Sequence, residues 1–428
     1  MTDIQLLLFL PLTAGILLFL IPETARTIKG IIALLVSTVG LYTSYNVFLE
    51  PAGMRFYSCQ LLPGLAEYLI LHLDNLSRMI ILFMGIFGFL LALYSLAYMT
   101  RDKVLKNYYN YFLITLGAAA GAVLANNFVT FTTFWGILGI TLYTLINGND
   151  EESSAAAKKS LIMIGASDSI LILGIGILWK LSGTLQMSEI NVPSSGGLGI
   201  IGFLCLVIAS LTKAGAFPVH TWLPDYVAKA PASSSALLPA SLDKLLGIYF
   251  LARICLNLFQ LTEAMTLVLL LIGGITILGA VMMALIQHSY KRLLGYHAVS
   301  QVGYMVTGIA LGSPLGLIAG LFHMLNNAIY KSGLFLTAGS VEKRTGKEDL
   351  DELGGLSKLM PLTFISALIF ALSISGIPPF NGFASKWMIY QGLIDFGKGS
   401  GIAHQLWFVW LALAVLGSAL TLASFVKF

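Results

Sequence analysis

Charge is scarce in this chain of 428 residues: Asp, Glu, Lys and Arg make up 10% of it, whereas apolar residues make up 57%. A soluble domain cannot bury that much apolar surface, so the composition excludes a soluble globular protein and predicts a polytopic membrane protein. The first apolar stretch, Ile4 to Pro22, follows no positive charge and contains no small-residue cleavage site. We therefore expect it to be a first membrane helix and not a cleaved signal peptide.

Cysteine is scarce as well, and histidine is scattered. Cys59, Cys205 and Cys255 show no C-x-x-C spacing, and the six histidines show no ligand spacing. The sequence therefore supports neither an iron–sulfur cluster nor a structural zinc, and it shows no nucleophile and base pair of an enzyme active site. We expect no cofactor in this chain. If redox chemistry drives its function, the redox sites belong to another subunit.

Thirteen stretches are long and apolar enough for a bilayer crossing of about 20 residues. These predicted spans cover approximately residues 4–22, 28–49, 74–99, 108–126, 128–147, 160–181, 198–220, 233–259, 264–287, 291–312, 315–340, 361–390 and 402–426. No segment is typical of a soluble domain, and the longest polar stretch, Glu342 to Lys358, is predicted to be a loop.

The 24 Lys and Arg residues are distributed unevenly between the two sets of alternate loops. One set, with the C-terminus, holds fifteen of them: Arg26, Lys29, Arg101, Lys103, Lys106, Lys158, Lys159, Lys229, Lys291, Arg292, Lys343, Arg344, Lys347, Lys358 and Lys427. The opposite set holds three: Arg55, Lys180 and Lys398. This asymmetry predicts a multi-pass protein of the plasma or inner membrane with an external N-terminus and a cytoplasmic C-terminus.

Six basic residues lie inside the predicted spans: Arg78, Lys213, Lys244, Arg253, Lys331 and Lys386. A lysine held in hydrocarbon costs roughly 2.5 to 3.5 kcal/mol even on the lenient insertion scale, so it marks an ion path by default. The pattern predicts a protein that moves protons or sodium ions. No ligand signature distinguishes the two ions.

Two spans are interrupted by proline near a lysine. Span 7 has Pro218 shortly after Lys213, and span 12 has Pro378 and Pro379 shortly before Lys386. Proline removes a backbone hydrogen bond, and irregular backbone survives at membrane depth only where protein or a wet cavity lines it. Paired interrupted helices in the two halves of a transporter indicate its ion path. The alternative is a proline kink that merely shapes packing.

Polar side chains form a stripe on span 11, where His323, Asn327 and Lys331 recur at every fourth residue and share one helical face. We interpret the stripe as a hydrated wire. Span 10 carries a similar stripe, which either continues the wire or forms hydrogen bonds between helices. It consists of His297, Ser300, Gln301 and Tyr304.

Span 8 contains the adjacent pair Asp243 and Lys244. Neighbouring residues lie about 100° apart around a helix, so these two side chains need not pair with each other. We expect Lys244 to face the interior together with Lys213 and Lys331.

Three long segments resemble a known family, the antiporter-like membrane subunits of respiratory complex I, membrane-bound hydrogenases and multi-subunit cation/proton antiporters. They are Lys213 to Leu238 (KAGAFPVHTWLPDYVAKAPASSSALL), Tyr290 to Met305 (YKRLLGYHAVSQVGYM) and Gly376 to Lys386 (GIPPFNGFASK). The resemblance covers roughly residues 60 to 428. The last segment, with Trp387 and Gln391 after it, is most similar to the hydrogenase-type branch.

The resemblance implies an all-α fold of about 13 transmembrane helices with two inverted five-helix repeats, each containing a half-channel and a broken helix. The implied segments are an N-terminal three-helix segment (1–107), a first repeat (108–259, spans 4–8) and a second repeat (260–428, spans 9–13). It also implies roles in ion translocation. Lys213 would be the pump lysine of the first repeat, Lys244 the connecting lysine, His323 and Lys331 the central axis, and Lys386 the terminal lysine of the second repeat.

Two departures from the family stand out. Relatives carry a glutamate directly after a tryptophan in span 5, where it pairs with the span 7 lysine, whereas this chain has Gly136 after Trp135. One possibility is that translocation depends mainly on Lys244, Lys331 and Lys386. The other is that Asp168 in span 6 supplies the missing carboxylate. If Asp168 does not supply it, Asp168 is an interfacial residue. The family also usually has a fourteenth helix, whereas thirteen spans are predicted here. The alternatives for this difference are truncation, a natural short form, and replacement by a helix of another subunit.

Three functions fit these observations. The leading one is a proton- or sodium-translocating membrane subunit of a redox-driven complex, such as a complex I-like or membrane-bound hydrogenase assembly. Its partners would be other membrane subunits and a peripheral redox arm with iron–sulfur or nickel–iron sites, and no nucleic acid. The alternatives are a subunit of a multi-subunit cation/proton antiporter without a redox partner, and a non-pumping scaffold subunit.

Overall fold

The structure is a computed structural model that describes residues 2–51, 53, 55–58, 69–99, 105–148, 150–193 and 196–426. Cys59 and the loop cations Arg101, Lys103 and Lys427 lie outside the described residues. The chain divides into two compact units, Met1–Ile190 and Asn191–Phe428. Repeats are defined by symmetry and not by compactness, so the repeat boundaries inferred from the sequence stay a prediction.

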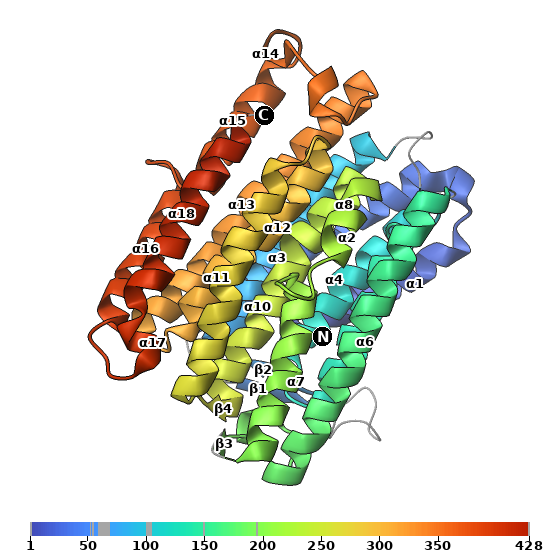
Figure 1. Ribbon diagram of the computed structural model, residues 1–428. Coiled ribbons are helices and arrows are strands. Elements are labelled where there is room, and N and C mark those ends of the chain that lie inside the picture. The colour runs from blue at the N-terminus through green and yellow to red at the C-terminus, as the bar shows by residue number, and fades with distance from the viewer. Residues whose placement is uncertain are drawn as a thin grey trace. The chain divides into compact units, whose positions relative to one another are not determined.

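The N-terminal unit consists of long apolar helices and one short hairpin (Figure 1). Its helices are α1 (Asp3–Leu17), η1 (Leu18–Leu20), η2 (Glu23–Ala25), α2 (Arg26–Leu49), α3 (Asn75–Tyr98), α4 (Tyr108–Leu124), α5 (Phe128–Thr144), α6 (Glu151–Ser182) and η5 (Met187–Glu189). Strands β1 (Arg55–Ser58) and β2 (Ile70–Leu73) pair antiparallel. Helix α1 packs against α4, α2 against α3, and α5 against both α4 and α6.

Several helices of this unit begin at residues that the sequence marks as caps. Thr2, Asp74, Asn127 and Asp150 each accept a hydrogen bond from a backbone N–H of the first helical turn. A side-chain oxygen at this position satisfies one of the N–H groups that have no partner within the helix. The starts of α1, α3, α5 and α6 are therefore encoded locally.

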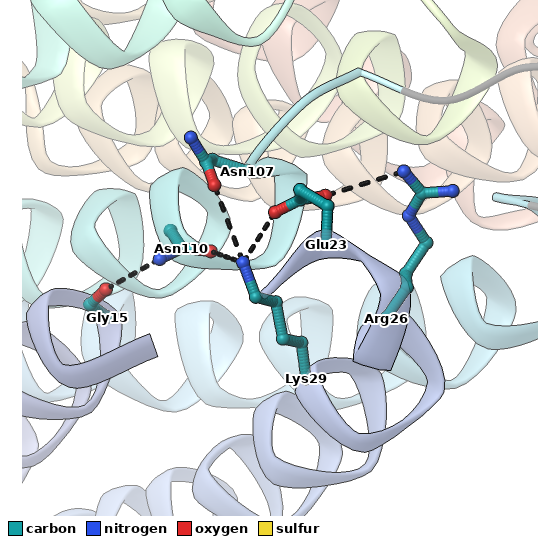
Figure 2. Close-up of polar contacts among 6 residues, drawn as sticks. All are labelled: Gly15, Glu23, Arg26, Lys29, Asn107 and Asn110. Atoms are coloured by element: carbon teal, nitrogen blue, oxygen red, sulfur yellow. Dashed lines mark hydrogen bonds and ion pairs between the residues drawn. The ribbon is translucent and has the colours of Figure 1, made fainter. Parts of the chain in front are cut away.

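A buried lysine joins α2 to α4 in the N-terminal unit (Figure 2). Lys29 is 1% exposed, and its Nζ lies 2.5 Å from Oε1 of Glu23. The same ammonium donates to the side-chain carbonyls of Asn110 at 3.3 Å and Asn107 at 3.4 Å. Asn110 in turn donates to the carbonyl of Gly15 in α1. Lys29, counted from the sequence among the loop cations, is therefore a buried tether between elements.

The C-terminal unit contains the helices on either side of both interruptions, as well as α12 and α13 (Figure 1). Its helices are α7 (Gly197–Ala214), α8 (Trp222–Lys229), α9 (Ala232–Ser235), η6 (Ala236–Leu242), α10 (Asp243–Arg253), η7 (Ile254–Leu258), α11 (Glu263–Leu285), α12 (Tyr290–Ala310), α13 (Pro314–Thr345), η8 (Leu350–Glu352), α14 (Leu356–Leu359), α15 (Pro361–Ser375), α16 (Asn381–Phe396), α17 (Ile402–Gln405) and α18 (Trp407–Phe425). The short strands β3 (Val192–Pro193) and β4 (Phe259–Gln260) pair in parallel.

The centre of this unit is the continuous helix formed by α9, η6, α10 and η7, Ala232–Leu258. Its most apolar window is 100% buried, whereas the corresponding window of α18 is 33% buried. Helix α10 packs against α7, and α12 lies between α11 and α13. The helix that carries Lys244 is therefore shielded by its neighbours.

Eight helices of the described residues are long and apolar enough to cross a membrane. Each of the thirteen predicted spans falls on helical structure, which confirms the all-α architecture. Helices α4, α5 and α15 are apolar but shorter, and the polar-striped α12 and α13 are not among the eight.

Span 8 is helical over Ala232–Leu258, with π-helical segments η6 and η7 within it. One detail of the predicted elements is wrong. The stretch from Glu342 to Lys358 is not only a loop, because α13 continues to Thr345 before η8 and α14 follow. Lys343 and Arg344 in the last turn of α13 stabilise its C-terminal end, and Gly346 ends the helix with a φ of 71°.

We expect Lys29→Met to lower the stability of the N-terminal unit by about 1 to 3 kcal/mol, because it leaves buried acceptors unpaired. Arg26→Met is the matched control, since Arg26 also pairs with Glu23, at 3.4 Å, but its side chain is 25% exposed. An exposed pair of this kind contributes about 0 to 1 kcal/mol. Thermal unfolding of the two purified variants measures the difference, and equal losses would contradict the tether.

Candidate functional site

The first interruption separates α7 from α8. Helix α7 ends at Ala214, and Gly215 closes it in a left-handed conformation with a φ of 78° that favours glycine. Trp222, the first residue of α8, donates its indole N–H to the carbonyl of Thr212 at 3.0 Å. Lys244 of α10 donates to the carbonyl of Ala214. An ammonium group thus satisfies a carbonyl that the interruption deprives of a helical partner.

Lys213, in the last turn of α7, forms an ion pair with Asp243. Nζ lies 3.9 Å from Oδ1, and the two side chains are 1% and 0% exposed. Asp243 follows directly on the π-helical segment η6, in which Pro239 has no N–H to donate. Ser241 donates to carbonyls of η6 at 2.7 and 2.8 Å, which partly satisfies its irregular backbone. Such π-helical turns occur frequently at functional sites.

The second interruption separates α15 from α16. Gly376 ends α15 in a left-handed conformation with a φ of 81°. Lys386 of α16 donates to the carbonyl of Ile374 at 2.8 Å, and its Nζ lies 4.7 Å from the ring centroid of Tyr304. The peptide bonds Phe217–Pro218 and Pro378–Pro379 are both cis. In each interruption a lysine from another helix donates to a carbonyl of the last two residues of the half-helix.

Asparagine side chains hold the start of α16. Asn326 of α13 donates to the backbone carbonyl of Asn381 at 2.9 Å, and the Asn381 amide donates back to the Asn326 side chain at 3.0 Å. Ser373 of α15 donates to the side-chain oxygen of Asn381. The second half-helix is therefore fixed to both α13 and α15 by polar contacts.

His323 lies at the centre of a hydrogen-bonded group between the interruptions. Its Nδ1 is 2.9 Å from the hydroxyl of Ser385, the neighbour of Lys386 in α16. Its Nε2 is 3.2 Å from Oε1 of Gln301 in α12, and the Tyr330 hydroxyl donates to the same oxygen at 3.4 Å. The stripes of α12 and α13 therefore meet at one place.

Lys331 continues this group toward α10. It donates to the carbonyl of Leu294 in α12 at 2.8 Å and is 0% exposed. Helix α13, which carries Lys331, also packs against α10, which carries Lys244. His297 Nε2 lies 2.8 Å from the hydroxyl of Ser424 in α18. Lys331 thus stands between the group at the first interruption and the group around His323.

Five of the six predicted translocation residues lie in the C-terminal unit, and each is at most 1% exposed. They are Lys213, Lys244, His323, Lys331 and Lys386. The sixth, Asp168, lies on α6 in the N-terminal unit, where it accepts a hydrogen bond from the indole of Trp135 at 2.9 Å. The predicted breaking prolines all lie in the interruptions, Pro218 before α8, and Pro378 and Pro379 before α16.

The two arginines within predicted spans have contacts of another kind. Arg78 donates to the carbonyls of Glu50 and Pro51 at 2.6 and 3.1 Å, at the C-terminal end of α2. Arg253 donates to the hydroxyl of Tyr249 at 3.1 Å and to Asn257 at 3.3 Å. These contacts cap or brace helix ends.

Asp243 is a partner of Lys213 that the sequence does not reveal. The π-helical segment before it sets the direction of its side chain, and no regular helical spacing predicts such a segment. The signal was present nevertheless, because a carboxylate within an apolar span is as unusual as a lysine there.

The family model described as NADH:quinone oxidoreductase/Mrp antiporter, TM, matches residues 125–418, which is more than half of the chain. The chain belongs to this family. It is accordingly an integral multi-pass membrane protein, and the resemblance seen in the three sequence segments is confirmed.

The NADH:quinone oxidoreductase/Mrp antiporter family includes longer relatives. The A1 subunit of the Na+/H+ antiporter from Staphylococcus haemolyticus is 32% identical, over 86% of this chain and 48% of the relative. The corresponding Na+/H+ antiporter subunit from Alkalihalophilus pseudofirmus is 30% identical, over 82% of this chain and 46% of the relative. The chain thus spans about half the length of the curated relatives it matches.

Solved structures share the fold over nearly the whole chain. A chain of the Mrp complex from a Dietzia species matches with a TM-score of 0.89 and 26% identity, over 99% of this chain and 78% of that chain. A chain of an archaeal membrane-bound sulfane sulfur reductase matches with a TM-score of 0.88 and 24% identity, over 99% and 86%. A chain of Thermus thermophilus respiratory complex I matches with a TM-score of 0.83 and 23% identity, over 100% and 88%.

The second interruption depends on a close approach at Gly382. A Cβ there would lie 1.8 Å from the carbonyl oxygen of Ser373, whereas a Cβ at Gly279 of α11 would meet nothing within 4 Å. We expect Gly382→Ala to destabilise the protein by about 1 to 3 kcal/mol through overpacking. Gly279→Ala should leave it unchanged or slightly more stable. Thermal unfolding of both variants tests this, and an unaltered Gly382→Ala protein would refute the close approach.

Proposed function

We propose that this chain is a cation/proton-translocating membrane subunit of a multi-subunit antiporter. The redox-driven complex favoured by the sequence becomes the second candidate. The two curated relatives described above are named Na+/H+ antiporter subunits. The matches to the sulfur reductase and complex I are under 25% identical and support a common fold rather than a shared redox partner. The partners of this chain would be other membrane subunits, because the similar solved chains come from complexes.

The observation that carries this proposal is the series of buried lysines in the C-terminal unit. Lys213, Lys244, Lys331 and Lys386 are all at most 1% exposed, at positions where a charge is costly. Asp243 pairs with Lys213 at one end of the series. At the other end His323 contacts Gln301 and Ser385, the neighbour of Lys386. A packing role alone would be served better by apolar side chains, since a buried charge gains little net stability.

Several polar atoms along this series have no hydrogen-bond partner among the described residues. They are both side-chain atoms of Asn327, Nε2 of Gln301, Nδ1 of His297 and both carboxylate oxygens of Asp243. Buried polar groups in proteins are almost always hydrogen-bonded, to protein or to ordered water. Bound water at these atoms would complete a chain of proton carriers from the first interruption to the second.

Lysine suits this task because it can exist in the charged and the neutral form. Burial disfavours an ammonium group, whereas a nearby carboxylate or carbonyl favours it. Lys244 and Lys386 donate to carbonyls at the two interruptions, so each can be loaded and unloaded as its surroundings change. We assign Lys213 and Lys244 to the first half of the path, Lys331 and His323 to its centre, and Lys386 to the second half. No step is assigned to Asp168.

Ion pairs within the C-terminal unit join three loops of the cation-rich set, which therefore lie on one side. Arg292 at the start of α12 pairs with Asp225 of α8 at 3.2 Å. Lys291 pairs with Glu342 at 3.3 Å and with Glu348 at 2.9 Å, near the end of α13. These residues come from the loop set that the charge asymmetry assigns to the cytoplasm. We therefore propose an external N-terminus and a cytoplasmic C-terminus.

We expect Lys331→Met to reduce cation-dependent proton transport by about tenfold or more, because it removes the central proton carrier. Transport is measured in everted membrane vesicles, with the variant chain in its native assembly, as the collapse of a preformed pH gradient after a sodium pulse. Lys358→Met is the control, since Lys358 is exposed in α14. Wild-type transport in Lys331→Met at normal chain levels would contradict the proposal.

The same vesicles separate the antiporter from the redox-driven complex. An antiporter collapses the preformed gradient when sodium or another alkali cation is added without an electron donor. A redox-driven subunit instead builds a gradient only when a donor is oxidised. A response to electron donors alone would favour the second candidate.

A further inference from the structure

We propose that Asp243 is the counter-ion shared by Lys213 and Lys244, and that it supplies within the C-terminal unit the carboxylate that relatives carry in span 5. This inference rests on the proposed function, because it assigns a positioning role in the same ion path. The chain has Gly136 at the position where the resemblance places a glutamate. Asp243 is a carboxylate that the structure places beside Lys213, at 3.9 Å.

The geometry places Asp243 beside Lys213, at the end of α7 where Lys244 also binds. Its Oδ1 lies 3.9 Å from Nζ of Lys213, which is an ion pair but beyond hydrogen-bonding distance. Lys244 is the next residue of α10. The Lys244 ammonium also donates to the carbonyl of Ala214, the residue next to Lys213. The three charged side chains therefore share one buried place at the end of α7.

The carboxylate has no other anchor among the described residues. Neither oxygen of Asp243 accepts a hydrogen bond there, although the residue is 0% exposed. A buried ion pair that serves only stability needs hydrogen bonds to its remaining lone pairs to offset desolvation. An anion held mainly by neighbouring cations instead responds to a change in charge on either of them.

The local backbone explains why the carboxylate lies here. The π-helical segment η6 ends at Leu242, and α10 begins with Asp243. A π-helical turn holds more residues than an α-helical turn, so it rotates the residues that follow relative to a regular helix. Ser241 and Ser332 donate to carbonyls of this segment, which stabilises the irregular backbone. The backbone of the buried helix therefore fixes the position of Asp243.

Charge balance defines what the shared counter-ion does. One carboxylate neutralises one ammonium, so two ammonium groups beside Asp243 leave one uncompensated positive charge. When one of the two lysines is neutral, this excess charge is absent. A proton that leaves the Lys244 ammonium and binds the neutral amine of Lys213 breaks one N–H bond, forms another and leaves the total charge constant. Asp243 can compensate the charge in either position. It favours transfer between the two lysines over loss of the proton from both.

The test replaces Asp243 in the chain within its native assembly. Asp243→Asn keeps the shape and removes the charge, and Asp243→Glu keeps the charge. We expect Asp243→Asn to lower sodium-dependent proton transport about tenfold or more, and to shift its pH optimum about one unit or more toward acid, because an ammonium at Lys213 loses its counter-charge. Asp243→Glu should restore a large part of the transport at the original optimum. Asp395→Asn is the control, since Asp395 pairs with Lys398 at the surface.

Each outcome supports or overturns the inference. Wild-type transport in Asp243→Asn overturns it, and so does an equal loss in Asp243→Asn and Asp243→Glu at normal chain levels, which indicates a packing role. The Asp243→Asn protein could fail to accumulate. In that case the double variant Asp243→Asn/Lys213→Met should accumulate again, because it removes the charges of both Asp243 and Lys213. A double variant that also fails to accumulate overturns the inference. Wild-type transport in Lys331→Met overturns the proposed function itself, whereas loss in Lys331→Met with wild-type transport in Asp243→Asn overturns only the role of Asp243.

Discussion

The C-terminal unit depends on one interaction. Two broken helices leave backbone carbonyls unpaired, and lysine ammonium groups bind these carbonyls. A carbonyl without a partner at membrane depth costs several kcal/mol, and so does an unpaired ammonium group. Lys244 at Ala214 and Lys386 at Ile374 offset both penalties at once. The arrangement requires that lipid be kept away. The most apolar window of the helix that carries Lys244 is accordingly 100% buried.

The choice of lysine over arginine separates the ion path from the scaffold. Arginine stays protonated in proteins, whereas buried lysine can lose its proton. Lysines accordingly occupy the two interruptions and the space between them, and Lys29 is a tether in the N-terminal unit, held there by Glu23 and two asparagines. The arginines within predicted spans bind carbonyls or side chains at helix ends. The same positive charge therefore serves different purposes according to its partners.

Much of this organisation is predictable from the sequence because it depends on strong local signals. Prolines beside Lys213 and Lys386 predict the interruptions, and the spacing of His323 and Lys331 predicts their common face on α13. The direction of Asp243 is not predictable in this way, because it depends on π-helical turns that no simple periodicity reveals. The burial of Lys29 is not predictable from local sequence either. It depends on contacts with Asn107 and Asn110, which are distant in sequence.

The most direct measurement is a density map of the intact membrane complex that resolves side chains and ordered water in the C-terminal unit. The ammonium groups of Lys244 and Lys386 should then lie on the carbonyls of Ala214 and Ile374, with water beside Asn327 and Gln301. Lysine side chains that extend to the headgroup region, or a dry interior between the two interruptions, would contradict this arrangement.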